Sequence, residues 1–168
     1  KPTLAQLESG SYSFTANATL SNGCTASQPI TITNTSKVWK GLSTNWDDPA
    51  NWKPAGLPTI DNCVIIPNNS IISGSNYNAY AKNLTVKSTG NLELQSTNNI
   101  TVADWVNVNT SGIFNIRNNA SLVQINNVSN TGIVNVERTT PGIRQLDYTY
   151  WSSPVSGFSL GSYSTSNS

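Results

Sequence analysis

The chain contains eight acidic residues and no histidine, so any acid–base chemistry would depend on carboxylates. Glu93 and Glu137 occupy similar places in two copies of a repeated phrase, and strand spacing predicts a separation of about 10 Å. That separation is just beyond the range that suits inversion at a glycosidic bond, and Asn115 stands between them. We expect Glu137 to pair in solvent with Arg138 or Arg144. Because nucleophilic triads and most metal hydrolases need a histidine base, we predict no catalytic residue, no cofactor and no enzymatic activity.

Three of the five tryptophans, Trp39, Trp46 and Trp52, fall within one short segment that also contains proline and glycine. Flat aromatic faces suit sugar rings, and loops often carry binding sites, so these three residues are the candidate ligand-binding set. The competing interpretation is that they cap the open end of a repeat architecture, which always requires covering. We favour the cap. The segment is predicted to be irregular, with one helical turn that Asp47 caps and Pro49 begins.

The two cysteines, Cys24 and Cys63, allow either a single disulfide in an oxidising compartment or two free thiols. A disulfide would join the N-terminal segment to the first coil. Two thiols without histidine do not make the usual tetrahedral site. The carboxylates of Asp47, Asp48 and Asp61 lack the regular spacing of a calcium loop. We therefore predict no metal site.

The composition favours β structure, because only 10% of the residues are charged and Thr, Asn, Ser, Val and Ile are abundant. The formal net charge is +1, and Lys and Arg are scattered singly, so we expect no nucleic-acid partner. No apolar run approaches the ~20 residues that span a bilayer, and we expect no membrane insertion.

A repeated phrase organises the centre of the chain. Its copies GNLEL, GIFNI and GIVNV begin at positions 90, 112 and 132, which are 22 and then 20 residues apart. Other apolar runs follow the same interval, since 84–86 resembles 106–108 and 100–102 resembles 122–125. Three short strands per period are typical of a solenoid. We predict an all-β fold, a right-handed parallel β-helix of about four coils over residues 63–138. The alternative is an antiparallel β-sandwich, whose strands also come 8–12 residues apart.

The N-terminal residues 1–36 predict two strands, because 11–16 and 30–33 alternate between apolar and polar residues. Between them, Asn22-Gly23 favours a type I′ hairpin turn. This segment is too short for a complete immunoglobulin-like sandwich, so we interpret it as the terminal strands of such a module. Its exposed edge would pair within the chain or with a neighbour.

The chain therefore divides into four predicted parts. Residues 1–36 hold the hairpin, 37–62 form a Trp-rich capping segment, and 63–138 form the β-helix. Residues 139–168 form a C-terminal cap and linker, with an aromatic cluster at 148–155 and a Ser-, Gly- and Tyr-rich end. Because the chain lacks an initiator Met and opens mid-phrase, we expect it to be a piece of a longer protein.

Several short motifs occur in a recognisable order across residues 38–155. They are WKG at 39–41, NW at 45–46 and again at 51–52, Pro58, VIIP at 64–67, AKNLTV at 81–86, VER at 136–138 and YWSSPV at 150–155. In this order they resemble a β-helical, adhesin-like module of secreted Bacteroidota surface proteins, which are cargo of the type IX secretion system. Residues 10–14 (GSYSF) and 22–27 (NGCTAS) resemble the closing strands of the immunoglobulin-like repeats that precede it. The resemblance implies an extracellular or cell-surface location and carries no catalytic residues.

The predicted function is a non-catalytic structural or adhesive segment of a large secreted bacterial cell-surface protein. A charge-poor repeat with Asn and Thr on its outer faces suits many weak polar contacts better than one reactive centre. Two alternatives remain open: a carbohydrate-binding accessory module of a secreted enzyme, and a subunit of an extracellular fibre. The expected partners are surface polysaccharide or neighbouring copies and modules of the same protein.

Overall fold

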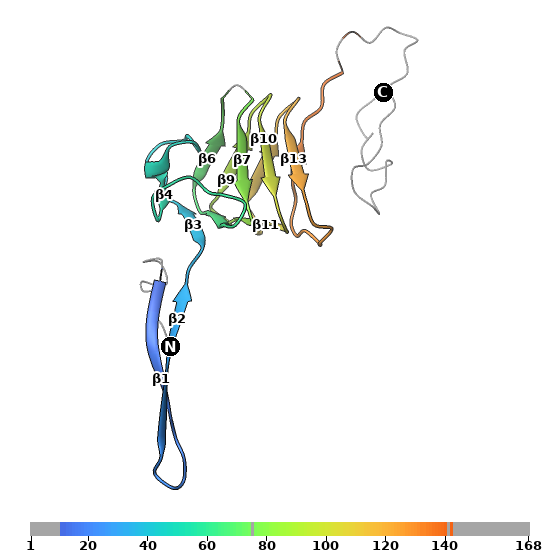
Figure 1. Cartoon of the computed structure of the whole chain (residues 1–168). Helices are drawn as coiled ribbons and strands as arrows, with labels where there is room; N and C mark the ends of the chain where they lie inside the picture. Colours follow the sequence, from blue (N-terminus) through green and yellow to red (C-terminus); the bar gives the residue numbers. More distant parts are fainter. Residues whose placement is uncertain (1–10, 75, 141, 143–168) are drawn as a thin grey trace. The chain divides into compact units, whose positions relative to one another are not determined.

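Most of the described chain is a stack of short parallel strands, and a β-hairpin comes before it in the sequence (Figure 1). The computed structural model describes residues 11–74, 76–140 and 142. Within these residues the only helix is a single 3-10 turn, and none is long and apolar enough to cross a membrane. The chain divides into two units, Lys1–Arg138 and Thr139–Ser168, and the first unit contains every strand described below.

Three sheets run along the stack, each made of strands from successive coils. In spatial order, the first sheet contains β11 (Val106–Val108), β8 (Asn83–Val86), β5 (Cys63–Ile66), β3 (Ser36–Trp39) and β4 (Trp52–Lys53); the second contains β14 (Asn135–Val136), β12 (Ile113–Ile116), β9 (Asn91–Leu94) and β6 (Asn69–Ile72); the third contains β13 (Ser121–Gln124), β10 (Asn99–Val102) and β7 (Asn78–Ala81). Apart from the antiparallel pair β3–β4, all neighbouring strands in these sheets are parallel.

The strand register follows the sequence repeat. Val64 pairs with Leu84, and Leu84 pairs with Val106, while Asn115 pairs with Asn135 in the repeated phrase. The predicted β-solenoid is therefore confirmed. The antiparallel β-sandwich is wrong, because each coil pairs in parallel with the coil before it. Three complete coils are present, against about four predicted, and β3 and β14 add partial turns at the two ends.

The core is a column of apolar side chains that enters the stack from all three sheets. Along β9, Leu92 and Leu94 are fully buried while Glu93 between them faces outward. Ile100 and Val102 on β10 are buried in the same alternating way. Each such burial contributes roughly 1.5–3 kcal/mol, and because every coil lacks a complete core of its own, only stacking makes these contributions available.

Glycine begins the repeated phrase because one coil passes very close to the coil before it. A Cβ atom at Gly90 would lie 2.2 Å from the carbonyl oxygen of Ile66, and one at Gly112 would lie 2.6 Å from that of Lys87. Both distances are far shorter than van der Waals contact, so a larger residue would push adjacent coils apart. The repeated glycine is thus a packing requirement of the corner between the first and second sheets.

The N-terminal hairpin pairs β1 (Ser11–Thr19) with β2 (Thr25–Thr33) in an antiparallel register. Its turn is closed by the Gly23 N–H, which donates to the Leu20 carbonyl oxygen at 2.9 Å, so Ser21 and Asn22 are the central residues. A type I′ turn needs positive φ at both central residues, but within this turn only Gly23, which follows them, has a positive φ (84°). The predicted type I′ turn centred on Asn22-Gly23 is therefore wrong.

The C-terminal end of the stack, residues 121–138, places a polar side chain in a core row. Gln124 pairs with Val102 and so continues a row of buried residues. Its side-chain amide donates to the carbonyl oxygen of Val128 at 2.8 Å and accepts from the amide of Asn130 at 2.7 Å. Several apolar side chains at this end are exposed: Val123, Ile125, Val128 and Ile133.

Candidate functional site

The three candidate tryptophans form a buried cluster at the N-terminal end of the stack, residues 36–53. Trp39, Trp46 and Trp52 are each no more than 1% exposed. The ring of Trp52 meets the other two edge-on, at centroid distances of 5.0 and 4.7 Å. Because no ring face is open to solvent, the sugar-stacking interpretation does not fit this arrangement. The rings belong to the same buried cluster as the coil residues, which is what a cap requires.

Asn51 holds the loop that carries these rings. It is fully buried, and its amide nitrogen donates to the Ser43 hydroxyl at 2.6 Å and to the Asn45 carbonyl oxygen at 3.0 Å. Its amide oxygen accepts from the Ser43 backbone N–H at 2.9 Å. One buried side chain therefore satisfies several backbone groups that would otherwise be left unpaired.

The helical turn predicted in this loop is present as η1 (Pro49–Asn51). Its cap is Asp48, whose carboxylate accepts from the Ala50 backbone N–H at 2.9 Å. The prediction placed the cap at Asp47, one residue too early. Pro49 begins the turn as expected, because its missing N–H costs nothing at that position.

Lys37 is a charged residue that the sequence did not single out at this end. It pairs with Val64, whose side chain is in the core. Its ammonium group donates to the carbonyl oxygens of Pro54 at 3.0 Å and Ala55 at 2.9 Å. Burial lowers the pKa of Lys37, because partial removal from water disfavours the charged form. An inward-facing charge of this kind discourages a further strand from joining the stack.

The two carboxylates considered for catalysis do not occupy equivalent positions. Glu93 pairs in register with Asn115, which pairs with Asn135. Glu137 comes two residues after Asn135, so it follows the repeated phrase whereas Glu93 lies inside it. The prediction that Glu93 and Glu137 share one row is therefore wrong. Glu137 lies beside Arg117 instead, which follows the preceding copy of the phrase.

Arg117 joins both carboxylates in one surface ion-pair network. A guanidinium nitrogen lies 2.7 Å from the carboxylate of Glu93, and another lies 3.5 Å from that of Glu137. The hydrogen bond from Arg117 lowers the pKa of Glu93, and the same bond raises the pKa of Arg117. A general acid at neutral pH needs a raised carboxyl pKa, so the shift at Glu93 runs in the opposite direction.

The expected pairing of Glu137 with Arg138 is also wrong. The Arg138 guanidinium donates to the carbonyl oxygens of Ala120 at 3.0 Å and Glu137 at 2.8 Å, and thereby fastens the last partial coil to the corner beneath it. Arg144, the other expected partner, lies outside the described residues.

The cysteines are both free thiols in the structure. Cys24 is exposed beside the hairpin turn, and Cys63 is the half-buried first residue of β5. The carboxylates of Asp47, Asp48 and Asp61 belong to no cluster: within the described ranges, no three His, Cys, Asp or Glu side chains lie close enough together to hold a metal ion.

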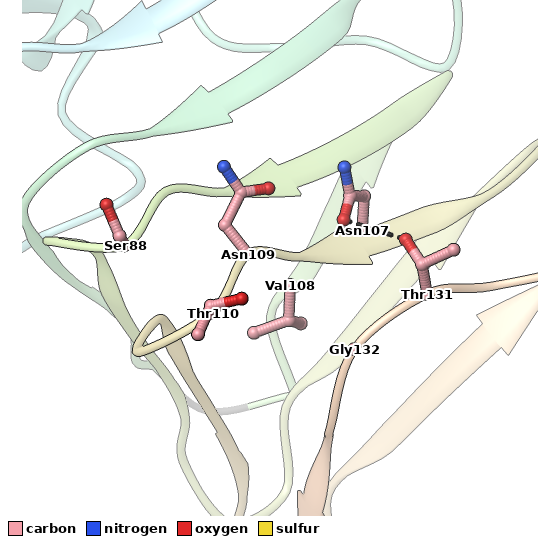
Figure 2. A pocket seen from close by; sticks show the side chains of 7 residues that line it. All are labelled: Ser88, Asn107, Val108, Asn109, Thr110, Thr131 and Gly132. Carbon is pink, nitrogen blue, oxygen red and sulfur yellow. Dashed lines mark hydrogen bonds between the residues drawn. The ribbon is translucent and has the colours of Figure 1, made fainter.

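The structure shows a shallow, open hollow, lined mostly by polar residues, that the sequence did not predict (Figure 2). It measures about 560 Å³ and opens at the corner where β11 ends. The lining comes from three successive coils and carries no charge: Ser88, Asn107, Val108, Asn109, Thr110, Thr131 and Gly132. Figure 2 shows Ser88, Asn109 and Thr110 toward one side, the Asn107–Thr131 pair toward the other, and Val108 between them.

The hollow depends on a contact between the last two coils. The Thr131 hydroxyl donates to the side-chain oxygen of Asn107 at 2.7 Å, and Asn107 and Thr131 also form an isolated parallel bridge. The only sequence signal for this site is the density of Asn and Thr near position 107, which many corners of this chain share. Its concavity arises because three coils meet there, and residue types alone do not show that.

The fold and its surface define a class of protein, a parallel β-solenoid whose N-terminal end is filled by tryptophans and whose outer faces are polar and carry few charges. Within that class, the chain belongs to the family described as "Domain of unknown function (DUF8693)", which matches residues 38–168. No curated protein matches the chain, and neither does any solved structure. The family match takes in the tryptophan segment together with the coils and leaves out the hairpin, so the cap and the coils form part of one family unit.

Proposed function

We propose that this chain is a non-catalytic structural and adhesive segment of a large secreted bacterial cell-surface protein. The observation that carries the proposal is the set of side-chain ladders on the outer faces of the coils. The side-chain amide nitrogen of Asn99 donates a hydrogen bond to the amide oxygen of Asn78 at 3.0 Å on the third sheet, and that of Asn135 donates to Asn115 at 3.0 Å on the second. On the first sheet, Thr131 bonds to Asn107.

These ladders give the stack a surface of short, neutral groups at regular intervals. Coils about 4.8 Å apart place polar side chains in the same outward rows, which favours many weak polar contacts along the stack axis. Such a surface also suits a spacer between other modules, because few charges are present to attract or repel a neighbour. An extracellular location and a type IX secretion route are part of the proposal, and the motif order described above supports them.

The carboxylates support the non-catalytic part of the proposal. Glu93 and Glu137 share the guanidinium of Arg117 on the outer surface, so both are engaged in a structural ion pair. Paired-carboxylate catalysis needs two acids that face one substrate with opposite pKa shifts. The geometry favours a role for Glu93, Arg117 and Glu137 in holding successive coils in register.

The test is deletion of residues 38–138 from the protein that carries them, followed by measurement of bacterial attachment to surfaces and to other cells. We expect attachment to fall while export and display of the remaining protein stay normal. A matched control removes the hairpin residues 11–33 and leaves the stack in place. Unchanged attachment after deletion of the stack, with normal display, would contradict the adhesive role.

A further inference from the structure

We propose that the hollow formed by Asn107, Asn109, Thr110, Thr131 and Ser88 binds a neutral oligosaccharide, with successive sugar units lying alongside successive coils. This inference rests on the proposed adhesive function and names its ligand class. It moves the carbohydrate contact away from the tryptophans, whose rings are buried, to a surface that the sequence did not suggest as a binding site.

The side chains that line the hollow have donors and acceptors that the protein does not use. Among the residues that the structure describes, the side chains of Ser88, Asn109 and Thr110 form no hydrogen bond with the protein, and Asn107 uses only its amide oxygen. Together they offer amide and hydroxyl groups that both donate and accept. A sugar hydroxyl also does both, so each ring can meet several partners at once.

The lining of the hollow carries no charge. All seven lining residues are neutral, so the hollow offers no cation to hold a phosphate, sulfate or uronate group. Anionic ligands are recognised mainly through Arg and Lys. The chemistry of the lining therefore selects a ligand with many hydroxyl groups and no net charge.

The site has a fixed shape. Val108 is only 4% exposed and belongs to the core, so it fixes the position of the segment that carries Asn107 and Asn109. A Cβ atom at Gly132 would lie 1.9 Å from the carbonyl oxygen of Val108, so the glycine allows the last coil to lie directly against β11. Because strands and corners hold the lining, little ordering is needed when a ligand binds.

The spacing of the coils matches the spacing of sugar units in an extended chain. Thr85 pairs with Asn107, and Asn107 pairs with Thr131, so one row of outward polar side chains runs along the stack into the hollow. Adjacent coils are about 4.8 Å apart, which is close to the length of one pyranose unit in an extended chain. An oligosaccharide lying parallel to the stack axis would present one sugar to each coil. The ligand is therefore a chain of at least three units.

The experiment is a titration of the full chain with neutral trisaccharides of glucose, mannose and galactose, followed by backbone amide NMR. We expect at least one trisaccharide to shift the signals of residues 107–110 and 131–132, and to bind about tenfold or more tightly than its monosaccharide. Asn109→Ala removes one hydrogen-bonding side chain from the hollow, so we expect this variant to bind the trisaccharide about fivefold more weakly. Asn127→Ala, at an exposed asparagine outside the lining, is the matched control and should bind like the unaltered chain.

Three outcomes would overturn the site. They are no shift with any of the three trisaccharides, equal loss in the Asn109→Ala and Asn127→Ala variants, and tighter binding of an acidic trigalacturonate than of every neutral trisaccharide. Any of them would leave the adhesive role intact, because the deletion that tests adhesion removes every surface of the stack. Conversely, saccharide binding with unchanged attachment after deletion would reject the adhesive role and retain the site.

Discussion

The two ends of the stack differ in how they cover the apolar core where the coils stop. At the N-terminal end, a dedicated loop supplies Trp39, Trp46 and Trp52, which are buried and packed edge-on. At the C-terminal end, the repeat itself is modified, since Gln124 replaces an apolar residue in a core row and bonds to its own loop. The first solution adds a large apolar surface, whereas the second only satisfies polar groups.

This difference implies a gradient of stability along the stack. In a solenoid each coil contacts only its neighbours, so the total stability is close to a sum of nearest-neighbour terms. A coil beside the tryptophan cluster has a well-filled interface on both sides. Among the described residues, only one side of the last coil is packed, and Ile133 near its end is 75% exposed. We therefore expect local opening to begin at the C-terminal end.

The largest expected effect is at Trp52. Trp52→Ala removes a ring that contacts both other tryptophans and a bond from its indole N–H to the Trp46 carbonyl oxygen. Removal of a large buried aromatic side chain costs about 3–5 kcal/mol of unfolding free energy. Ile133→Ala at the other end should cost less than about 0.5 kcal/mol, because that side chain is mostly exposed. Urea denaturation measures both, and similar losses would remove the contrast between the ends.

The corner glycines give the second effect. Gly90→Ala places a Cβ atom against the carbonyl oxygen of Ile66 in the middle of the stack, and such overpacking costs about 1–3 kcal/mol. Ser88→Ala, in the same corner, is the control and should be nearly neutral. Gly132→Ala brings a Cβ atom even closer to the carbonyl oxygen of Val108 and adds backbone strain at a φ of 86°, but no described coil lies beyond the last one, so it can move outward. We expect Gly90→Ala to lower the denaturation midpoint more, and the reverse order would show that the last coil is as rigid as the middle.

Loss of the Gln124 hydrogen bonds at the C-terminal end should have a smaller effect on stability. Gln124→Ala leaves the Asn130 amide and the Val128 carbonyl oxygen without their partner, and each lost bond contributes about 0.5–1.5 kcal/mol. Ser121→Ala on the same strand serves as the control. Hydrogen exchange of backbone amides on β13 and β14 should accelerate in the first variant and not in the second. Faster exchange on β5 as well would mean that the stack opens as one unit.

The smallest effect is the pH dependence of the Glu93–Arg117 pair. The folded-state pKa of Glu93 is lowered by its hydrogen bond to Arg117, so the pair stabilises the fold above the ordinary glutamate pKa of about 4.3. That stabilisation is lost as the pH falls below this value through the folded-state pKa. The difference in urea midpoint between the unaltered chain and Glu93→Gln should be small at pH 7 and shrink further by pH 3. A difference that grows on acidification would contradict the assigned direction.

The repeat made the coils predictable because register in a stack is set by coil length. The interval from Val64 to Leu84 and the three glycine phrases were enough to place the strands over one another, and the structure bears this out. The inward and outward alternation at Leu92, Glu93 and Leu94 followed from strand geometry alone.

Features that depend on contacts across irregular backbone were not predictable in the same way. Lys37 lies in a core row because carbonyl oxygens at positions 54 and 55 accept its ammonium group, and nothing in the strand pattern indicates that. The turn at Gly23 and the cap at Asp48 each differ by about one residue from the prediction, since several polar residues in a row can fill either role. The hollow beside Asn109 was missed because its walls come from three coils.

The stacking of successive coils also determines how the protein would unfold under a mechanical force. A pull on the two chain termini acts on coils that are held one to the next, so they should detach singly and in order, starting from Arg138. Each detached coil of about 21 residues would release roughly 70 Å of extended chain. Single-molecule stretching would then record a short series of evenly spaced steps, and the last and strongest step would be the rupture of the tryptophan cluster.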